Sequence, residues 1–353
     1  MDTISPIFHK ILSRHFSADD IVIIAPLNWG LGHATRCIPL IQYLKSICKQ
    51  VIIASDGSSL VLLREEFPDM NFEELPSYNI RYSFKSIFLN ILMLTPSLIR
   101  AVFAERKYAS KIVRSYNATI ILSDNRFGFK SSFVKNIYMT HQVKILHNHP
   151  IISFLGSKTH QWFIKRFDIC LVPDYSDERS LCPELTHRDS IKKIFIGPIT
   201  RIKKLALPMN WDICVMLSGP EPQRSILEKE LIKQLIILKQ YKILFVTGKE
   251  EVYDDIPLPT HISIRGLLTA SEVEEILNSS QLLISRSGYS TIMDIENLDI
   301  HAIFIPTPGQ TEQEYLGQLF SLKFKYNYLP QNKIGQLAEI IEKQFAKINY
   351  SPK

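Results

Sequence analysis

The sequence predicts an α/β protein of two doubly wound, Rossmann-like domains that face each other across a cleft. Two observations support this prediction. Short apolar runs alternate with longer stretches of helical periodicity, and the alternation restarts after a basic, proline-containing segment at residues 197–208. Such alternation is typical of parallel sheets covered by helices. A length of 353 residues agrees with two domains of ordinary size.

In the first half of the chain, short apolar runs predict strands, and the longer intervals between them predict helices. The runs are residues 21–25, 51–55, 119–123, 137–140, 169–173 and 194–197. The helices expected most clearly are 36–47, 58–67 and 86–115. Because ligands of such sheets bind at the carboxyl ends of the strands, polar residues that follow these runs are candidate site residues.

The second half of the chain repeats the pattern and ends in an amphipathic helix. Its apolar runs are 213–217, 243–247, 282–285 and 302–306, with helices near 224–239, 271–278 and 333–348. We therefore expect a first domain over 1–200, a second over 201–332, and a last helix over 333–353 that could pack back on the first domain.

Composition and charge exclude several classes of protein. With 46% hydrophobic and 22% charged residues, the chain can bury two cores and is not disordered. A net charge of +6 favours an anionic surface or substrate, but it is too small to indicate nucleic acid, and no nucleic-acid-binding motif is present. The five cysteines are scattered without a C-x-x-C pair, which argues against a disulfide framework or a zinc site and fits a reducing cytosol.

One segment is a candidate for membrane contact. The start of the chain has no apolar core followed by a cleavage site, so we expect no signal peptide. The most apolar stretch, 86–104, contains polar residues and a proline that make a buried span costly. The helix 84–107 is instead expected to lie on an anionic leaflet, with a basic border of Lys85, Arg100, Arg106 and Lys107. A core helix with a solvated end is an equal alternative.

A glycine turn follows the first apolar run. Gly30 and Gly32 permit a tight turn and the close approach of another group, and the next helix offers free N–H groups. The turn is not a P-loop, because no G-K-[ST] follows. It is a poor dinucleotide fingerprint too, because Thr35 occupies the third glycine position.

His33 and Asp124 are the candidate catalytic residues. His33 sits where the glycine turn would aim it into the cleft, and Asp124 ends another strand of the same sheet. A carboxylate there could orient His33 and raise its basicity, as a general base needs. The simpler alternatives are a histidine that hydrogen-bonds the turn and an aspartate that caps the next one.

Three loops of the second half are candidate ligand sites. Ser218 and Gly219 feed a helix N-terminus, which is a ready anion site, although a plain connection is the alternative. In 285–294, hydroxyls and N–H groups could surround a phosphate, and Asp294 could accept hydrogen bonds from ribose hydroxyls. The amide-rich loop 306–315 is suited to reading sugar hydroxyls, and as an ordinary loop it would be unexceptional.

These motifs resemble a known family. The stretch R-S-G-x-x-T-x-x-D at 286–294, followed by Q-x-x-Q-x-Y at 310–315, is similar to the carboxy-terminal domain of glycosyltransferase family 28. The G-x-G-H turn, the G-P-x-x-R linker and the Ser-Gly turn also occur in the family's order. The family includes the lipid II N-acetylglucosaminyltransferase of peptidoglycan synthesis. Its first turn has further glycines that this chain lacks, so that activity is not assigned.

The resemblance implies the two-domain GT-B fold and a role for each matching residue. It implies a ribose contact for Asp294, a donor-sugar contact for Gln313, and backbone contacts to the base near 266–268. Glu314 stands where the family often has a second Gln, so the donor sugar is open. The complete expected donor-binding set is Gly30, Gly32, Arg201, Ser218, Gly219, Gly266, Leu267, Leu268, Arg286, Ser287, Gly288, Ser290, Thr291, Asp294, Gln310, Gln313 and Glu314.

Together, the residues and the resemblance predict an inverting, metal-independent glycosyltransferase. It would move a hexose or N-acetylhexosamine from a UDP-sugar to a lipid-linked or cell-envelope glycan acceptor. His33, oriented by Asp124, is the expected base. No convincing D-x-D site is present, so we expect neither a metal nor a cofactor besides the donor. The expected location is the cytoplasm, on the inner face of the cytoplasmic membrane.

Two other functions stay open from the sequence. The turn G-x-G-H-x-x-R at 30–36 also resembles that of UDP-sugar hydrolases of sialic-acid-like sugar synthesis, in which water replaces the acceptor. The long apolar helix favours a lipid acceptor and hence transfer. A non-catalytic protein that binds nucleotide sugars is the second alternative, and the broken fingerprint disfavours a dinucleotide oxidoreductase.

Overall fold

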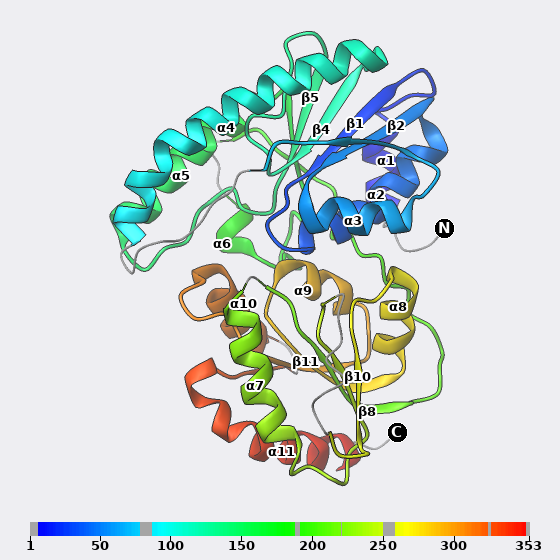
Figure 1. Cartoon of the computed structure of the whole chain (residues 1–353), viewed down its shortest axis with the longest axis vertical. Coiled ribbons are helices and arrows are strands. Elements are labelled where there is room, and N and C mark those ends of the chain that lie inside the picture. Colours follow the sequence, from blue (N-terminus) through cyan, green and yellow to red (C-terminus); the bar gives the residue numbers. More distant parts are fainter. Residues whose placement is uncertain are drawn as a thin grey trace. The chain divides into compact units, whose positions relative to one another are not determined.

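The computed structural model describes residues 6–77, 87–187, 191–219, 221–249, 258–323 and 326–350. The chain divides into two compact units, Met1–Arg201 and Ile202–Lys353. Each unit contains one parallel sheet with helices beside it (Figure 1). Among the described residues, no helix has both the length and the apolar character needed to cross a membrane.

The first unit contains a seven-stranded sheet in the order β3-β2-β1-β4-β5-β6-β7, with every pair parallel. Its strands are β1 Ile21–Pro26, β2 Gln50–Ser55, β3 Asn71–Glu74, β4 Ile120–Asp124, β5 Lys135–Met139, β6 Ile169–Val172 and β7 Ile194–Phe195. The strand order reverses between β1 and β4. This reversal is the switch point at which doubly wound sheets bind ligands.

Helices cover the first sheet because its central strands are apolar on both faces, as buried parallel strands are. The helices are α1 Pro6–Leu12, α2 Gly32–Ile47, α3 Gly57–Glu66, α4 Ile87–Tyr116, α5 Pro150–Ile164 and α6 Pro183–Thr186. Ala109 and Ile112 of α4 share a core cluster with Ile23 of β1 and Ile121 of β4. Figure 1 shows α4 and α5 on one side of this sheet and α2 and α3 on the other.

The second unit repeats this plan with six parallel strands in the order β10-β9-β8-β11-β12-β13. The strands are β8 Trp211–Met216, β9 Ile243–Val246, β10 Ile262–Arg265, β11 Ser280–Ser285, β12 His301–Phe304 and β13 Asn327–Tyr328. The helices are α7 Gln223–Leu235, α8 Ala270–Asn278, α9 Tyr289–Ile295, α10 Thr311–Lys323, the 3₁₀ helix η1 Gln331–Gln336 and α11 Leu337–Tyr350. Its switch point lies between β8 and β11.

The last helix, α11, packs within the second unit. Leu337, Ile341 and Phe345 are buried in a core cluster with residues of α7 and of the second sheet. The ring of Phe345 stacks on Tyr241 with centroids 4.4 Å apart. From the sequence, this helix could have packed on the first domain. Its described apolar residues instead pack in the core of the second unit.

Several elements differ from their sequence-based expectation. Strands β3, β10 and β13 were not expected, because each carries polar, partly exposed residues at an edge of its sheet and so lacks a continuous apolar run. Helix α2 begins at Gly32 and not at 36, so the glycine turn leads directly into it. Helix α7 ends at Leu235, four residues before the expected end.

A buried arginine connects distant elements of the first unit. Arg126, which follows β4, is fully buried. Its guanidinium is bonded to Asp56, donates from Nη1 to Oε1 of Glu105 at 2.7 Å, and donates from Nε to the carbonyl of Pro26 at 3.2 Å. Asp56 precedes α3 and Glu105 lies in α4. The cluster therefore joins the end of β1 to both helices.

Replacing Arg126 with leucine should destabilise the first unit by about 3–5 kcal/mol, because two buried carboxylates, Asp56 and Glu105, would lose the charged group that bonds them. Native-state hydrogen exchange of the β1 and β4 amides measures this loss within the first unit. The control is Arg179→Leu, which removes an exposed arginine paired with Asp177 and should leave the exchange unchanged. Equal exchange in both variants would contradict a stabilising role for the cluster.

Candidate active site

The glycine turn of the first unit lies at the switch point of its sheet. In the register of β1 and β4, Pro26 pairs with Asp124, and the N–H of Leu27 donates to the Asp124 carbonyl at 3.0 Å. Gly30 has a φ of +82°, a left-handed conformation that favours glycine. The turn therefore leads directly into the first residues of α2.

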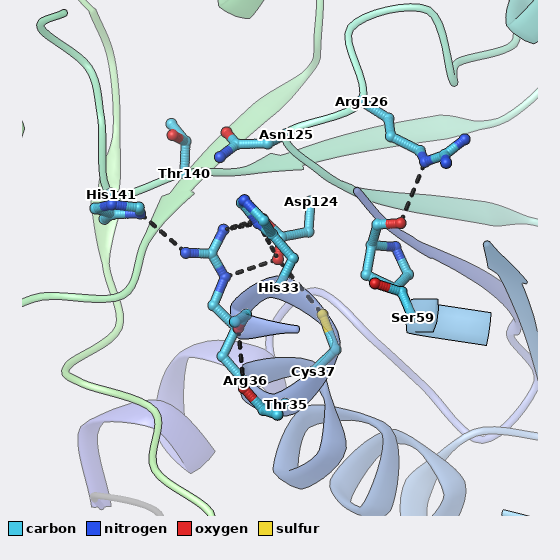
Figure 2. Close-up of polar contacts among 12 residues, drawn as sticks. His33, Thr35, Arg36, Cys37, Ser59, Asp124, Asn125, Arg126, Thr140 and His141 are labelled. Atoms are coloured by element: carbon cyan, nitrogen blue, oxygen red, sulfur yellow. Dashed lines mark hydrogen bonds and ion pairs between the residues drawn. The ribbon is translucent and has the colours of Figure 1, made fainter. Parts of the chain in front are cut away.

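The structure brings the two predicted catalytic residues together and adds a third. His33 Nδ1 lies 3.3 Å from Oδ2 of Asp124. Arg36, one turn further along α2, donates from Nε to the same Oδ2 at 2.7 Å and also bonds Oδ1 through Nη2. Nη2 of Arg36 lies 2.8 Å from His33 Nδ1. Figure 2 shows the guanidinium lying among these side chains.

The charges at this site shift the pKa of both predicted residues. Burial alone would raise the pKa of Asp124, but the charge of Arg36 and the contacts with His33 hold it well below its usual range. Burial, and then the charge of Arg36, lower the pKa of His33 more than Asp124 raises it. Asp124 raises the pKa of His33, as expected, but burial and Arg36 together outweigh it. The net lowering of the pKa favours the neutral imidazole.

His141 and Cys37 also contact this group of side chains, here called the first cluster: His33, Arg36, Cys37, Asp124 and His141. His141 follows β5 and is buried, and its Nδ1 lies 2.9 Å from Nη1 of Arg36. Cys37 Sγ lies 3.6 Å from Oδ2 of Asp124, and burial raises the pKa of this thiol well above its usual value. Sequence analysis missed Arg36 and His141 as site residues. The arginine of the G-x-G-H-x-x-R turn was the available signal, whereas nothing local marks His141.

Asn28 holds the beginning of the glycine turn. Its Oδ1 accepts hydrogen bonds from the hydroxyls of Ser58 and Ser59 at 3.2 and 3.1 Å, and its amide donates to Asp56 at 3.4 Å. Because Asp56 also bonds Arg126, the turn is tied to the buried cluster beneath it. The indole of Trp29, next along the chain, is 58% exposed.

In the second unit, the predicted ligand loops meet at the carboxyl edge of the sheet. Ser218 and Gly219 follow β8, and the segment from Arg286 to Thr291 follows β11, its neighbour at the switch point. Gly219 has a φ of +103°. Gly266 to Leu268 follow β10, and Asp294 lies in α9, partly exposed. Since all these strands are parallel, these residues share one edge.

Arg286 holds this edge together. It is 1% exposed, and its Nη1 donates to the carbonyls of Ile305 and Pro306 and to Oε1 of Gln331 at 3.0, 2.9 and 2.8 Å. Its Nη2 donates to the carbonyl of Gln223 at 3.0 Å. These contacts give Arg286 a structural role, and its expected contact with the donor stays a prediction.

The loop after β12 is shaped by its own side chains. Oε1 of Gln313 accepts from the N–H of Thr307 at 2.8 Å, and its amide donates to Oε1 of Gln310 at 2.6 Å. Glu314 accepts from the N–H of Gly309 at 3.1 Å. The buried hydroxyl of Ser287 donates to the Gln313 carbonyl at 2.6 Å and so joins two of the expected ligand loops.

Thr307 is a candidate that sequence analysis missed. It is 3% exposed, and within the described part of the chain its Oγ1 has no hydrogen-bond partner. A Cβ placed on Gly219 would meet this oxygen at 4.0 Å, so the hydroxyl faces the Ser-Gly turn. A buried hydroxyl without a partner is costly unless a ligand or water completes it.

The structure also gives the positions of three other predicted residues. Arg201 is the last residue of the first unit. Ser290 and Thr291 lie in the first turn of α9, partly exposed. In the described ranges, no group of three His, Cys, Asp or Glu side chains is arranged to hold a metal ion. The donor-binding roles of the whole predicted set stay predictions.

Comparison with known proteins identifies the class. Residues 224–353 match the glycosyltransferase family 28 C-terminal domain. An uncharacterized glycosyltransferase of Methanopyrus kandleri is 20% identical over 304 residues, 80% of this chain and 82% of that protein. The UDP-N-acetylglucosamine–N-acetylmuramyl-(pentapeptide) pyrophosphoryl-undecaprenol N-acetylglucosamine transferase of Exiguobacterium sibiricum is 32% identical over 124 residues, 33% of each chain.

Solved structures show the same architecture. Spinosyn rhamnosyltransferase SpnG in complex with thymidine diphosphate resembles the chain with a TM-score of 0.63 at 11% identity, covering 93% of this chain and 92% of that one. The fold is therefore GT-B, as expected. With the matched domain and the relatives, the chain is a glycosyltransferase, and the resemblance of its second unit to family 28 is confirmed.

Proposed function

We propose that the chain transfers a hexose or N-acetylhexosamine from a UDP-sugar to a lipid-linked or cell-envelope glycan acceptor. Transfer inverts the anomeric carbon and needs no divalent ion. The observation that carries the proposal is the family 28 match, because the matched residues include both motif loops at the ligand edge of the second sheet. The name of the Exiguobacterium relative supports a UDP-linked donor and a polyprenyl-linked acceptor.

The donor would bind across the carboxyl edge of the second sheet. We assign the diphosphate to Arg201, Ser218 and the segment 287–291, and the ribose to Asp294. The base would lie against the backbone of 266–268. The sugar would be read by the side chains that shape the last loop, Gln310, Gln313 and Glu314. Hydroxyls, N–H groups and the arginine would balance the charge of the leaving diphosphate, an electrostatic role that usually contributes a few kcal/mol.

In the proposed step, His33 takes the acceptor proton. The acceptor oxygen attacks the anomeric carbon, its O–H bond breaks, and the proton passes to Nε2 of His33. The bond between the anomeric carbon and the diphosphate breaks as the new C–O bond forms, and UDP leaves with the electron pair. Attack from the face opposite the leaving group inverts the configuration. The lowered pKa of His33 favours the neutral imidazole, which a base requires.

A UDP-sugar hydrolase is the second candidate function. It is favoured by Arg36, because this residue completes the G-x-G-H-x-x-R turn and contacts His33 directly. The same site would then activate a water molecule in place of an acceptor hydroxyl. Release of UDP that does not respond to added lipid acceptor would favour hydrolysis over transfer.

We also propose that the enzyme works on the cytoplasmic face of a membrane. The sequence assigned this contact to helix 84–107, but residues 84–86 and the side chains through 99 lie outside the described residues. Helix α5 supplies the observed support. Its outer face exposes four large apolar side chains at 51–63%, here called the α5 surface: Ile151, Phe154, Leu155 and Trp162.

Basic residues border the α5 surface. Lys158 Nζ lies 5.5 Å from the centroid of the Phe154 ring, and Arg166 Cζ lies 3.2 Å from that of Trp162. Lys165 is also exposed. Apolar residues at helical spacing, with aromatic rings and long cationic side chains at their border, suit insertion into an anionic headgroup layer.

His33→Gln should lower the rate of UDP release by roughly 100-fold or more, because general-base help contributes about that much. UDP binding, measured by calorimetry, should be unchanged, because His33 lies in the first unit and the donor loops in the second. Near-normal turnover would exclude His33 as the base.

We also assign the Thr307 hydroxyl to the diphosphate, because it faces the Ser218–Gly219 turn. Thr307→Val should therefore weaken UDP binding by about tenfold, because it removes that hydrogen bond while conserving side-chain shape. The same calorimetric titration measures the UDP affinity of this variant. Thr186→Val, which removes a buried hydroxyl of the first unit that bonds Asp174, is the matched control and should not alter affinity. Equal affinity in wild type and Thr307→Val would remove Thr307 from the donor site.

The paired substitution Phe154→Gln and Leu155→Gln should lower co-sedimentation with phosphatidylglycerol vesicles by about tenfold or more, given the apolar area lost from the interface. Ile237→Gln and Leu322→Gln, which replace more exposed apolar residues of the second unit, are the control. If the wild-type protein did not co-sediment with anionic vesicles, the membrane assignment would be refuted.

A further inference from the structure

Arg36 uses its whole guanidinium inside the first cluster. Although Arg36 is 3% exposed, Nε donates to Asp124 at 2.7 Å, Nη1 lies 2.9 Å from His141 Nδ1, and Nη2 lies 2.8 Å from His33 Nδ1. In Figure 2 the group lies between Asp124 and His141, with His33 beside it. No other cation contacts His33 among the described residues.

This geometry determines where the proton of His33 resides. A guanidinium only donates hydrogen bonds, so the Nδ1 atom that it contacts must accept. In a neutral imidazole, one nitrogen carries the proton and the other accepts. With Nδ1 accepting from Arg36, the proton of His33 is on Nε2.

The resting tautomer of His33 therefore cannot act as the base through Nε2. An Nε2–H group can donate a hydrogen bond to an acceptor oxygen, but it cannot take a proton from it. The base needs a free Nε2 lone pair and a proton on Nδ1. That proton would be donated to Asp124, whose Oδ2 lies 3.3 Å away. In a neutral ring, Nδ1 can accept a hydrogen bond from Arg36 or donate one to Asp124, but it cannot do both at once.

We propose that Arg36 is a positioning residue that holds His33 in the Nε2–H tautomer, and that the base forms when Nη2 of Arg36 leaves Nδ1. One proton then passes from Nε2 to water and one from water to Nδ1, so the ring stays neutral. Asp124 keeps its bond from Nε of Arg36 and gains one from Nδ1–H. This inference rests on the proposed role of His33 and deepens it.

The charged and titratable groups around His33 agree with this assignment. They are Arg36 on α2, Asp124 at the end of β4 and His141 after β5, with Cys37 bonded to the same carboxylate. Arg36 lowers the pKa of His33, and Asp124 raises it. Removing the guanidinium should therefore raise the pKa of His33 and turn Nδ1 toward Asp124.

The direct test is ¹⁵N NMR of the histidine side chains in the full-length, ligand-free protein, with His33 assigned by its absence in His33→Gln. At pH 7, wild-type His33 should show a protonated Nε2 and a bare Nδ1, with a tautomer ratio of at least about ten to one, because hydrogen bonds from charged donors are strong enough for that bias. A bare Nε2 and protonated Nδ1 in wild type would overturn the proposal.

Two variants separate the effect of Arg36 on the tautomer of His33 from the effect of its positive charge on the pKa of His33. Arg36→Lys keeps a cation for Asp124, but an ammonium is a point charge without the planar fork that reaches all three partners. It should shift His33 toward the Nδ1–H tautomer. Arg36→Met also removes the charge, so the acid limb of the kcat/KM profile should move to higher pH. If Arg36→Met does not fold, the wild-type and Arg36→Lys spectra decide.

The outcomes separate this inference from the proposed function. A merely structural role for Arg36 would lower stability in both variants without changing the tautomer of the folded protein, and that result would overturn the inference. Full turnover by His33→Gln would instead remove the proposed base while leaving the tautomer assignment intact. UDP affinity should be the same in wild type and Arg36→Lys.

Discussion

The buried pair of Arg36 and Asp124 is the interaction on which the candidate active site depends. Asp124 ends β4 at the switch point with no exposed surface, and an ionised carboxylate there persists only beside a counter-charge. Arg36 supplies that charge from the first turns of α2. The pairing fixes α2 against the sheet, which places His33 beside the carboxylate and brings His141 to the same guanidinium. A glycine turn without this pair would leave the histidine unpositioned.

In both units, a buried arginine bonds several of the loops at the carboxyl edge of the sheet. Arg126 joins the end of β1 to Asp56 and to Glu105 of α4, and Arg286 gathers the loops after β11 and β12 through main-chain carbonyls. Parallel sheets expose carbonyls and loops at their carboxyl edges, and a planar group with several donors can satisfy many of them at once. The loops after β1, β11 and β12 are therefore held by buried arginines.

The two units carry different groups at the ligand edges of their sheets. The first has the imidazole of His33, whose pKa is lowered, beside a carboxylate paired with Arg36, and these groups fit the base that we propose. The second has hydroxyls and amides, and Oγ1 of Thr307 has no hydrogen-bond partner within the described residues, which fits the donor site that we propose. A GT-B fold alone does not choose between transfer and hydrolysis. The exposed α5 surface supports our proposal of a membrane-bound acceptor.

The sequence by itself determined the two parallel sheets, the position of the glycine turn and the family of the second unit, because apolar periodicity and short motifs are local properties of the chain. It missed β3, β10 and β13, whose edge positions give them no continuous apolar run. The tertiary structure alone decided the partners of the buried charges. Arg36 and Asp124 lie 88 residues apart, and His141 lies 105 residues from Arg36. The sequence predicted that Asp124 raises the pKa of His33, and it does, but burial and Arg36 lower that pKa by more. This opposing effect depends on the fold, because a buried carboxylate takes its counter-ion from the segment that the sheet order brings beside it.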